Sequence, residues 1–138
     1  MFDVVTGGAG FIGSHLVDTL VGQGNEVLVI DSLCAGRKET IARHIGSCKV
    51  RFVQKDLLAD GWQESIAGAD RLFHLAADPD VRQSAVNPDP TMQNNIMATY
   101  RVLEAMRVPG LETPDELKAE EHESASDVLM AEETGFRD

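Results

Sequence analysis

The sequence predicts an α/β fold: a parallel sheet with helices on both of its faces. Apolar runs of strand length recur at residues 4–6, 26–31, 50–54 and 71–77. The stretches between these runs are long enough for crossover connections, and the first shows a helical apolar pattern from Phe11 onward. Strands that alternate with such stretches form crossover units, and crossover units place neighbouring strands parallel.

A glycine-rich turn joins the first predicted strand to the first predicted helix. It contains Gly7, Gly10 and Gly13, each three residues after the one before. In a strand–turn–helix unit of this kind, one glycine allows a tight exit from the strand. A second lets the backbone approach a pyrophosphate, and the third lets the helix pack closely on the sheet. The turn therefore indicates a nucleotide-binding unit.

The residues around this turn extend the prediction to a dinucleotide and a Rossmann-type sheet. A helix that begins near Phe11 and Ile12 directs its free N–H groups and its positive dipole end toward the pyrophosphate. Asp31 ends the next strand, where an adenosine ribose would offer its hydroxyls. The Asp31 charge would repel a 2′-phosphate, which favours NAD as the cofactor. Arg37 and Lys38 could host that phosphate, so NADP stays open.

The rest of the chain continues the alternation. We expect one or two helical turns at 40–45, a short helix at 58–68 and a long amphipathic helix at 91–107. The prediction is thus a partial NAD-binding domain at 1–110, whose sheet is truncated after about four strands. A second segment, 111–138, is expected to be an acidic tail that is weakly helical or disordered.

Composition excludes several classes of function. The net charge of the 138 residues is −11, and residues 112–138 contribute ten acidic and two basic side chains to it. Nucleic acid is not expected as a partner, because phosphate binding needs a basic surface. We see neither a membrane span nor a leader, so no membrane partner and a cytoplasmic location are expected. Cys34 and Cys48 lack metal spacing and are expected to be reduced thiols; no metal site is predicted.

The run Thr6-Gly7-Gly8-Ala9-Gly10-Phe11-Ile12-Gly13-Ser14-His15-Leu16 resembles the opening of the extended short-chain dehydrogenase/reductases. Among these it is close to the UDP-glucose 4-epimerases and other nucleotide-sugar epimerases and dehydratases. Later stretches resemble the family's adenosine-ribose loop (Asp31-Ser32-Leu33), its adenine-side pair (Asp56-Leu57), its nicotinamide-side segment (His74-Leu75-Ala76-Ala77) and its next helix (Asn94-Asn95-Ile96-Met97-Ala98-Thr99). The family usually has glycine at the position of Ala98. The resemblance implies NAD contacts from Gly7, Gly10, Phe11, Ile12, Gly13, Asp31, Ser32, Ala35, Gly36, Asp56, Leu57, Leu75, Ala76, Ala77 and Asn94.

The sequence departs from this family at its catalytic centre. The resemblance implies a Ser/Thr, a Tyr and a Lys, with the Tyr and the Lys four residues apart on one helix. Here the single tyrosine, Tyr100, is followed at that spacing by Glu104, so no catalytic residue is assigned. The chain resembles the first part of an epimerase whose second part, with its UDP-sugar domain, is lost or replaced.

Three hypotheses about function remain. The chain is an NAD-binding fragment that is inactive alone, an epimerase completed by another chain, or a non-enzymatic module for NAD sensing or protein interaction. An edge strand left uncovered invites pairing with another chain, so we expect a homo-oligomer formed through the 91–107 helix or the exposed sheet edge.

Some of these residues have simpler readings that the sequence leaves open. Gly8 and Ala9 could serve only the turn, Asp56 could cap a turn, and Arg82 could contact a phosphate or merely solvate a loop. We expect His74 to be a core histidine with a satisfied hydrogen bond. His15 is expected at the surface or at a cap, and Tyr100 in packing or on a helix surface.

Overall fold

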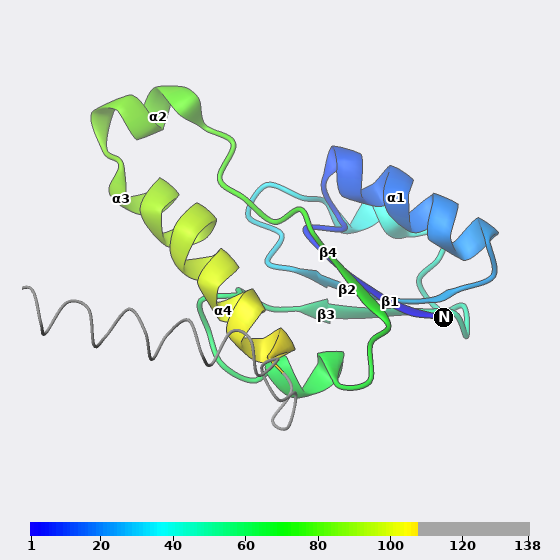
Figure 1. Cartoon of the computed structure of the whole chain (residues 1–138). Coiled ribbons are helices and arrows are strands. Elements are labelled where there is room, and N and C mark those ends of the chain that lie inside the picture. The colour runs from blue at the N-terminus through cyan, green and yellow to red at the C-terminus, as the bar shows by residue number, and fades with distance from the viewer. Residues whose placement is uncertain (108–138) are drawn as a thin grey trace, which may run out of the picture. The chain divides into compact units, whose positions relative to one another are not determined.

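The computed structural model describes residues 1–107, and within them the chain forms a four-stranded parallel sheet in the order β3-β2-β1-β4 (Figure 1). The predicted Rossmann-type α/β fold is confirmed. Because β1 pairs with β2 on one side and β4 on the other, the strand order reverses at the middle of the sheet. The strands are β1 (Phe2–Thr6), β2 (Glu26–Asp31), β3 (Val50–Gln54) and β4 (Arg71–His74).

Helical segments connect the strands and continue beyond the last one. The regular helix of the first crossover is α1, which begins at Phe11 as the sequence predicts. The others are shorter, and the last three follow one another without a break. Their bounds are α1 (Phe11–Gly22), η1 (Lys38–Ile41), η2 (Gln63–Ile66), α2 (Val81–Val86), α3 (Asp89–Thr91), the π-helix η3 (Met92–Met97) and α4 (Ala98–Met106).

Apolar side chains cover both faces of the sheet, which is typical of parallel sheets. Successive residues of β1 and β2 point to opposite faces, so each strand contributes to two cores. The α1 face buries Val5, Val17, Leu20, Val27, Val29, Ile41 and Val50. The opposite face buries Val4, Leu28, Ile30, Leu57, Trp62, Ile66, Ala98 and Val102. Helical segments therefore pack on both faces, α1 on one and η2 with α4 on the other (Figure 1).

Three predicted elements differ in extent. The fourth strand ends at His74 and not at Ala77, because its partner β1 ends at Thr6, opposite His74. The short helix expected at 58–68 is only the 3-10 helix η2, and the turns expected at 40–45 begin two residues earlier, with the 3-10 helix η1.

The helix expected at 91–107 is composite. It starts with α3, passes through the π-helix η3 and becomes α-helical only from Ala98. The preceding helix α2 was not anticipated, although Asp80 caps it by accepting a hydrogen bond from the Gln83 N–H at 2.9 Å. A helix of six residues is too short to show a clear apolar period, so its cap was the only local signal. The predicted tail, 111–138, lies outside the described residues.

A charged group is buried at the amino end of the sheet. Asp3 is fully buried on β1, and both of its carboxylate oxygens accept hydrogen bonds from the Arg71 guanidinium, at 2.8 and 2.9 Å. Asn25 donates a further bond of 2.7 Å. These bonds, with that from Arg71 foremost, hold the pKa of Asp3 below its usual value. The cluster joins β1, β4 and the start of β2 on the side of the sheet away from the glycine turn.

Candidate functional site

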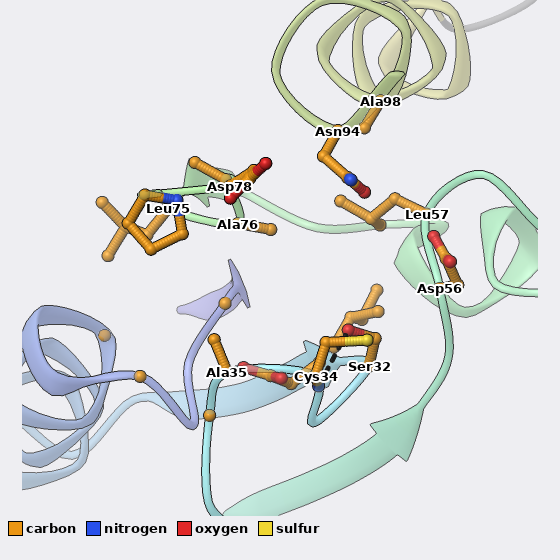
Figure 2. Close-up of a pocket in the computed structure, with 18 of the residues that line it drawn as sticks. Ser32, Cys34, Ala35, Asp56, Leu57, Leu75, Ala76, Asp78, Asn94 and Ala98 are labelled. Carbon is orange, nitrogen blue, oxygen red and sulfur yellow. Dashed lines mark hydrogen bonds between the residues drawn. The ribbon is translucent and has the colours of Figure 1, made fainter. Parts of the chain in front are cut away.

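A cavity of about 750 Å³ opens at the carboxyl ends of the strands. In open α/β sheets, ligands bind at this edge, where the strand order reverses. All fifteen residues that the sequence analysis assigned to the cofactor line this cavity: Gly7, Gly10, Phe11, Ile12, Gly13, Asp31, Ser32, Ala35, Gly36, Asp56, Leu57, Leu75, Ala76, Ala77 and Asn94. Segments far apart in the sequence therefore meet around one space. Figure 2 shows the loop with Ser32 and Ala35 on one side and the helix with Asn94 on another.

The glycine turn forms the floor between β1 and α1. Gly7 has a φ of 68°, and a Cβ built on it would lie 2.6 Å from the backbone nitrogen of Ala76. A Cβ on Gly13 would lie 2.2 Å from the Gly7 carbonyl oxygen. Neither position can accept a side chain without movement of backbone. The turn consequently brings bare backbone to the cavity just where the first N–H groups of α1 have no acceptor within the helix.

Asp31 fixes the position of this turn as well as lining the cavity. Its carboxylate is 7% exposed and accepts hydrogen bonds from the N–H of Ala9 at 2.9 Å and of Leu33 at 2.8 Å. The second bond supports Leu33 in the left-handed region, with a φ of 62°. A carboxylate has about four acceptor sites, so lone pairs remain for a ligand's hydroxyls.

The two basic residues considered as hosts for a 2′-phosphate do not line the cavity. The backbone N–H of Arg37 donates to the Ala9 carbonyl at 3.0 Å. The ammonium of Lys38 lies 5.5 Å from the centre of the Phe52 ring. Neither residue therefore belongs to the lining that Asp31 shares.

The second side of the cavity follows β3. Asp56 lines it and also closes a turn, since its Oδ1 accepts the Leu58 N–H at 2.8 Å. Asp56 thus caps a turn, as one interpretation of the sequence expected, and it also lines the cavity. Leu57 is buried against the core, and its carbonyl accepts a 3.2 Å hydrogen bond from the Trp62 indole. This part of the lining is anchored in the packed face of the sheet.

The third side is the segment that leaves β4, opposite α4 and η3. Leu75, Ala76 and Ala77 line it, and they belong to no strand or helix. Asn94 faces it from η3 (Figure 2), and its amide donates to the Pro90 carbonyl at 2.8 Å. The π-helical turn therefore places an amide side chain at the cavity.

Six lining residues were not anticipated. They are Ile30, Cys34, Lys55, Asp78, Pro79 and Ala98. Most are sequence neighbours of predicted residues, so a wider window around each motif would have found them. Ala98 occupies a position at which the family that the sequence resembles usually has glycine. That difference could have indicated Ala98 as a lining residue.

Other candidates lie outside the cavity. Gly8 and Ala9 do not line it, which agrees with a role in the turn alone. Arg82 is exposed on α2, and Tyr100 is 56% exposed on α4, as expected for a helix surface. His15 is exposed on α1, with its Nδ1 4.0 Å from Asp18.

His74 is half-buried at the end of β4 and bonded through both ring nitrogens, in agreement with the expectation of a satisfied core histidine. Its Nδ1 lies 2.7 Å from the Thr6 hydroxyl and its Nε2 3.0 Å from the Thr99 hydroxyl. Burial lowers the pKa of His74 from its usual value. This shift favours the neutral imidazole at pH 7.

Comparison with known proteins agrees with this geometry. The family described as "NAD dependent epimerase/dehydratase family" matches residues 4–118. The chain belongs to this family. UDP-glucuronic acid decarboxylase 1 of Arabidopsis thaliana is 38% identical over 100 residues, which cover 72% of this chain and 22% of that protein.

Solved structures of the family superpose on the described sheet. UDP-glucose 4-epimerase of Thermus thermophilus, in complex with NAD, gives a TM-score of 0.69 at 34% identity and covers 78% of this chain and 34% of its own. UDP-glucuronic acid 4-epimerase of Bacillus cereus, solved with UDP-glucuronic acid and NAD, gives 0.70 at 34% identity and covers 76% and 36%. The chain thus spans about a third of these epimerases and less of the decarboxylase.

No helix among residues 1–107 is long and apolar enough to cross a membrane. No group of three or more His, Cys, Asp or Glu side chains in the same range is arranged to hold a metal ion.

Proposed function

We propose that residues 1–107 bind NAD as the cofactor module of a nucleotide-sugar epimerase or dehydratase. The observation that supports this most directly is the cavity, because the bare backbone of Gly7 and Gly13, the Asp31 carboxylate and the Leu75–Ala77 segment all border it. Each has the chemistry that one part of a dinucleotide needs.

The proposed cofactor lies across the sheet edge in one direction. The pyrophosphate sits over the start of α1, where the helix dipole and the backbone N–H groups favour an anion. The adenosine extends toward Asp31 and Asp56, and its ribose hydroxyls donate to the Asp31 carboxylate. The nicotinamide lies toward Ala76 and Asn94. A 2′-phosphate would meet the Asp31 charge, so the module prefers NAD to NADP.

The family resemblance implies that turnover needs a tyrosine and a lysine four residues apart, and the 138 residues contain no such pair. Their single tyrosine, Tyr100, has Glu104 and not lysine four residues later, and Tyr100 does not line the cavity. We therefore propose that these residues hold cofactor without catalysing epimerisation by themselves. The second form of the proposal is an epimerase in which another chain supplies the tyrosine, the lysine and the UDP-sugar site.

One observation favours an interaction role beside cofactor binding. The helical segment of η3 and α4 exposes six large hydrophobic side chains: Met92, Ile96, Met97, Tyr100, Leu103 and Met106. Within residues 1–107, β4 also pairs only with β1. We propose that this helix face or this sheet edge joins two copies of the chain. Sedimentation over a range of concentrations tests it: a monomer at all of them refutes the proposal.

Calorimetric titration with NAD tests cofactor binding. Ala35→Phe fills the cavity from an exposed loop position, and Ala42→Phe adds the same ring at an exposed position outside the cavity. We expect the wild type and Ala42→Phe to bind NAD alike and Ala35→Phe to bind at least about tenfold more weakly, since the ring occupies the proposed adenosine side. Equal binding by all three would place NAD elsewhere, and no binding by the folded wild type would refute the cofactor proposal.

A second titration tests the preference for NAD. Asp31→Asn removes the charge but keeps the size and one acceptor oxygen. The wild type should bind NAD more tightly than NADP, and the substitution should narrow that difference. An unchanged ratio would show that Asp31 does not face the 2′ position.

A further inference from the structure

The cavity wall at residues 75–79 lies beyond the last paired residue of β4, and only its first residue still bonds to the backbone of β1, through a 3.1 Å hydrogen bond from the Leu75 N–H to the Thr6 carbonyl. It follows the end of β4, yet its backbone approaches the glycine turn so closely that a Cβ on Gly7 would lie 2.6 Å from the Ala76 nitrogen. The Thr6 hydroxyl also bonds to this wall: it accepts from the Leu75 N–H at 3.2 Å, which it shares with the Thr6 carbonyl, and from the Ala76 N–H at 3.4 Å. The orientation of the Thr6 hydroxyl thus affects the hydrogen bonds that position this wall of the cavity.

The hydrogen-bond chain around His74 fixes that orientation. The Thr99 hydroxyl donates its only hydrogen to the Asn95 carbonyl, at 2.7 Å, so it must accept from His74 Nε2–H. Neutral His74 then carries its proton on Nε2, and its bare Nδ1 accepts from the Thr6 hydroxyl. The Thr6 hydroxyl hydrogen thereby points toward the imidazole. The two lone pairs of the Thr6 hydroxyl oxygen stay available to accept from the backbone N–H groups of the wall.

A protonated His74 is incompatible with this arrangement. Its Nδ1–H would point at the Thr6 oxygen, which already accepts from Leu75 and Ala76, and a hydroxyl oxygen has two lone pairs for these three donors. At least one bond to the wall must weaken. The groups that face the two ring nitrogens, Thr6 on β1 and Thr99 on α4, are uncharged, and burial is the cause that lowers the pKa of His74.

The helical segment of α3, η3 and α4 also bonds to the wall at a second residue, Asp78. The Asn95 side chain accepts from the Asp78 N–H at 2.6 Å and donates to the Asp78 carbonyl at 3.1 Å. The Thr91 hydroxyl adds a 3.3 Å bond to the Asp78 carboxylate. The wall is therefore bonded to the helical segment at Asp78, and through His74 and Thr6 at Leu75 and Ala76.

We propose that His74 is a positioning residue: as the neutral Nε2–H tautomer it links Thr99 to Thr6 and so holds the Leu75–Ala77 wall in the place required for cofactor binding. This inference rests on the proposed NAD site for its functional consequence, but the tautomer and the wall geometry stand without it. Neither His74 nor Thr99 lines the cavity, so both act through the wall rather than on the ligand.

Nitrogen NMR of the histidine side chains tests the first half without any ligand. In the wild type at pH 7 we expect the His74 signals of the Nε2–H tautomer. Thr99→Val removes the acceptor at almost constant volume and should shift the His74 nitrogens together with the amide signals of Leu75 and Ala76. Thr99→Ser keeps the hydroxyl and should retain the wild-type signals. An Nδ1–H tautomer in the wild type would overturn the proposal.

Titration with NAD tests the second half. We expect Thr99→Val to bind about fivefold more weakly and Thr99→Ser to bind within about twofold of the wild type, since one net hydrogen bond is lost only in the first. NAD affinity should also fall as His74 becomes protonated below its usual pKa, and His44→Gln, a substitution remote from the wall, should keep that dependence.

The outcomes separate the inference from the function on which it rests. Failure of the wild type to bind NAD, with the predicted tautomer and amide shifts present, refutes the proposed function but not the positioning of the wall. Wild-type binding that Thr99→Val and acid leave unchanged refutes the positioning role and leaves the NAD site intact.

Discussion

Replacing Gly13 with alanine adds a single methyl group at the closest backbone contact in the glycine turn. That Cβ would lie 2.2 Å from the Gly7 carbonyl oxygen and 2.7 Å from the Gly8 Cα. Real Cβ atoms keep at least 3.0 Å from such neighbours, so the first contact must lengthen by about 0.8 Å. Both neighbours are backbone and no rotamer change can relieve them. The start of α1 must therefore move away from the turn.

The cost can be bounded from the structure. Forcing extra atoms into a packed site costs about 1–3 kcal/mol, and backbone contacts belong at the upper end of that range. Gly22 provides a matched control in the same helix, because a Cβ there meets nothing within 4 Å. Gly22→Ala should stabilise the chain by about 0.5–1 kcal/mol through the lower entropy of the unfolded state and the higher helix propensity of alanine. Replacing glycine with alanine thus has opposite effects on stability at Gly13, in the first turn of α1, and at Gly22, its last residue.

Urea unfolding followed by fluorescence measures both variants. Trp62 is the single tryptophan of the chain and is fully buried, so its emission reports the loss of the core. We expect a lower midpoint for Gly13→Ala and a higher one for Gly22→Ala. A Gly13→Ala chain as stable as the wild type would refute the close packing of α1 on the turn. If Gly13→Ala is still folded, its weakened NAD binding would connect the turn to the ligand.

Three further predictions concern stability. Arg71→Met should cost about 2–3 kcal/mol because it leaves the buried Asp3 carboxylate short of its main donor. In the wild type, the lowered pKa of Asp3 stabilises the folded chain at pH values above the usual pKa of 3.8, and this stability is lost as the pH falls through the pKa of the folded state. Acid titration of Arg71→Met should lack this loss of stability. Val102→Ala should lower the free energy of unfolding by about 2 kcal/mol, because Val102 is buried. Leu103 is 61% exposed, so Leu103→Ala should change that free energy by no more than about 0.5 kcal/mol. If a second copy of the chain covers Leu103, the effect of Leu103→Ala should depend on protein concentration. Asp31→Ala should destabilise even the ligand-free chain by about 2–3 kcal/mol, measured by urea unfolding, because two backbone N–H groups lose their acceptor.

The last of these predictions shows why a binding residue read from sequence can be misjudged. The position of Asp31 at a strand end indicates a ribose ligand, and nothing local indicates that its carboxylate also holds Ala9 and Leu33. Loss of NAD binding in Asp31→Ala would therefore mix two effects. Asp31→Asn, which keeps an acceptor, and the loop variant Ala35→Phe separate them better.

The sequence by itself determined the strands, the first helix and fifteen of the residues around the cavity. The strands and the helix depend on local patterns, namely apolar runs and glycine spacing. The fifteen lining residues follow from the resemblance of their motifs to one family, and most of them meet because parallel strands bring their carboxyl ends to one edge of the sheet.

Only the tertiary structure decided where β4 stops, how the helix from Asp89 is built and what holds the wall. β4 ends at His74 because β1 ends at Thr6, and no property of residues 75–77 themselves reveals it. The chain Thr6–His74–Thr99 joins residues 68 and 25 positions apart. Such bonds are invisible to periodicity because a hydroxyl or imidazole satisfies its partners in space, after the sheet and the helix have brought them together.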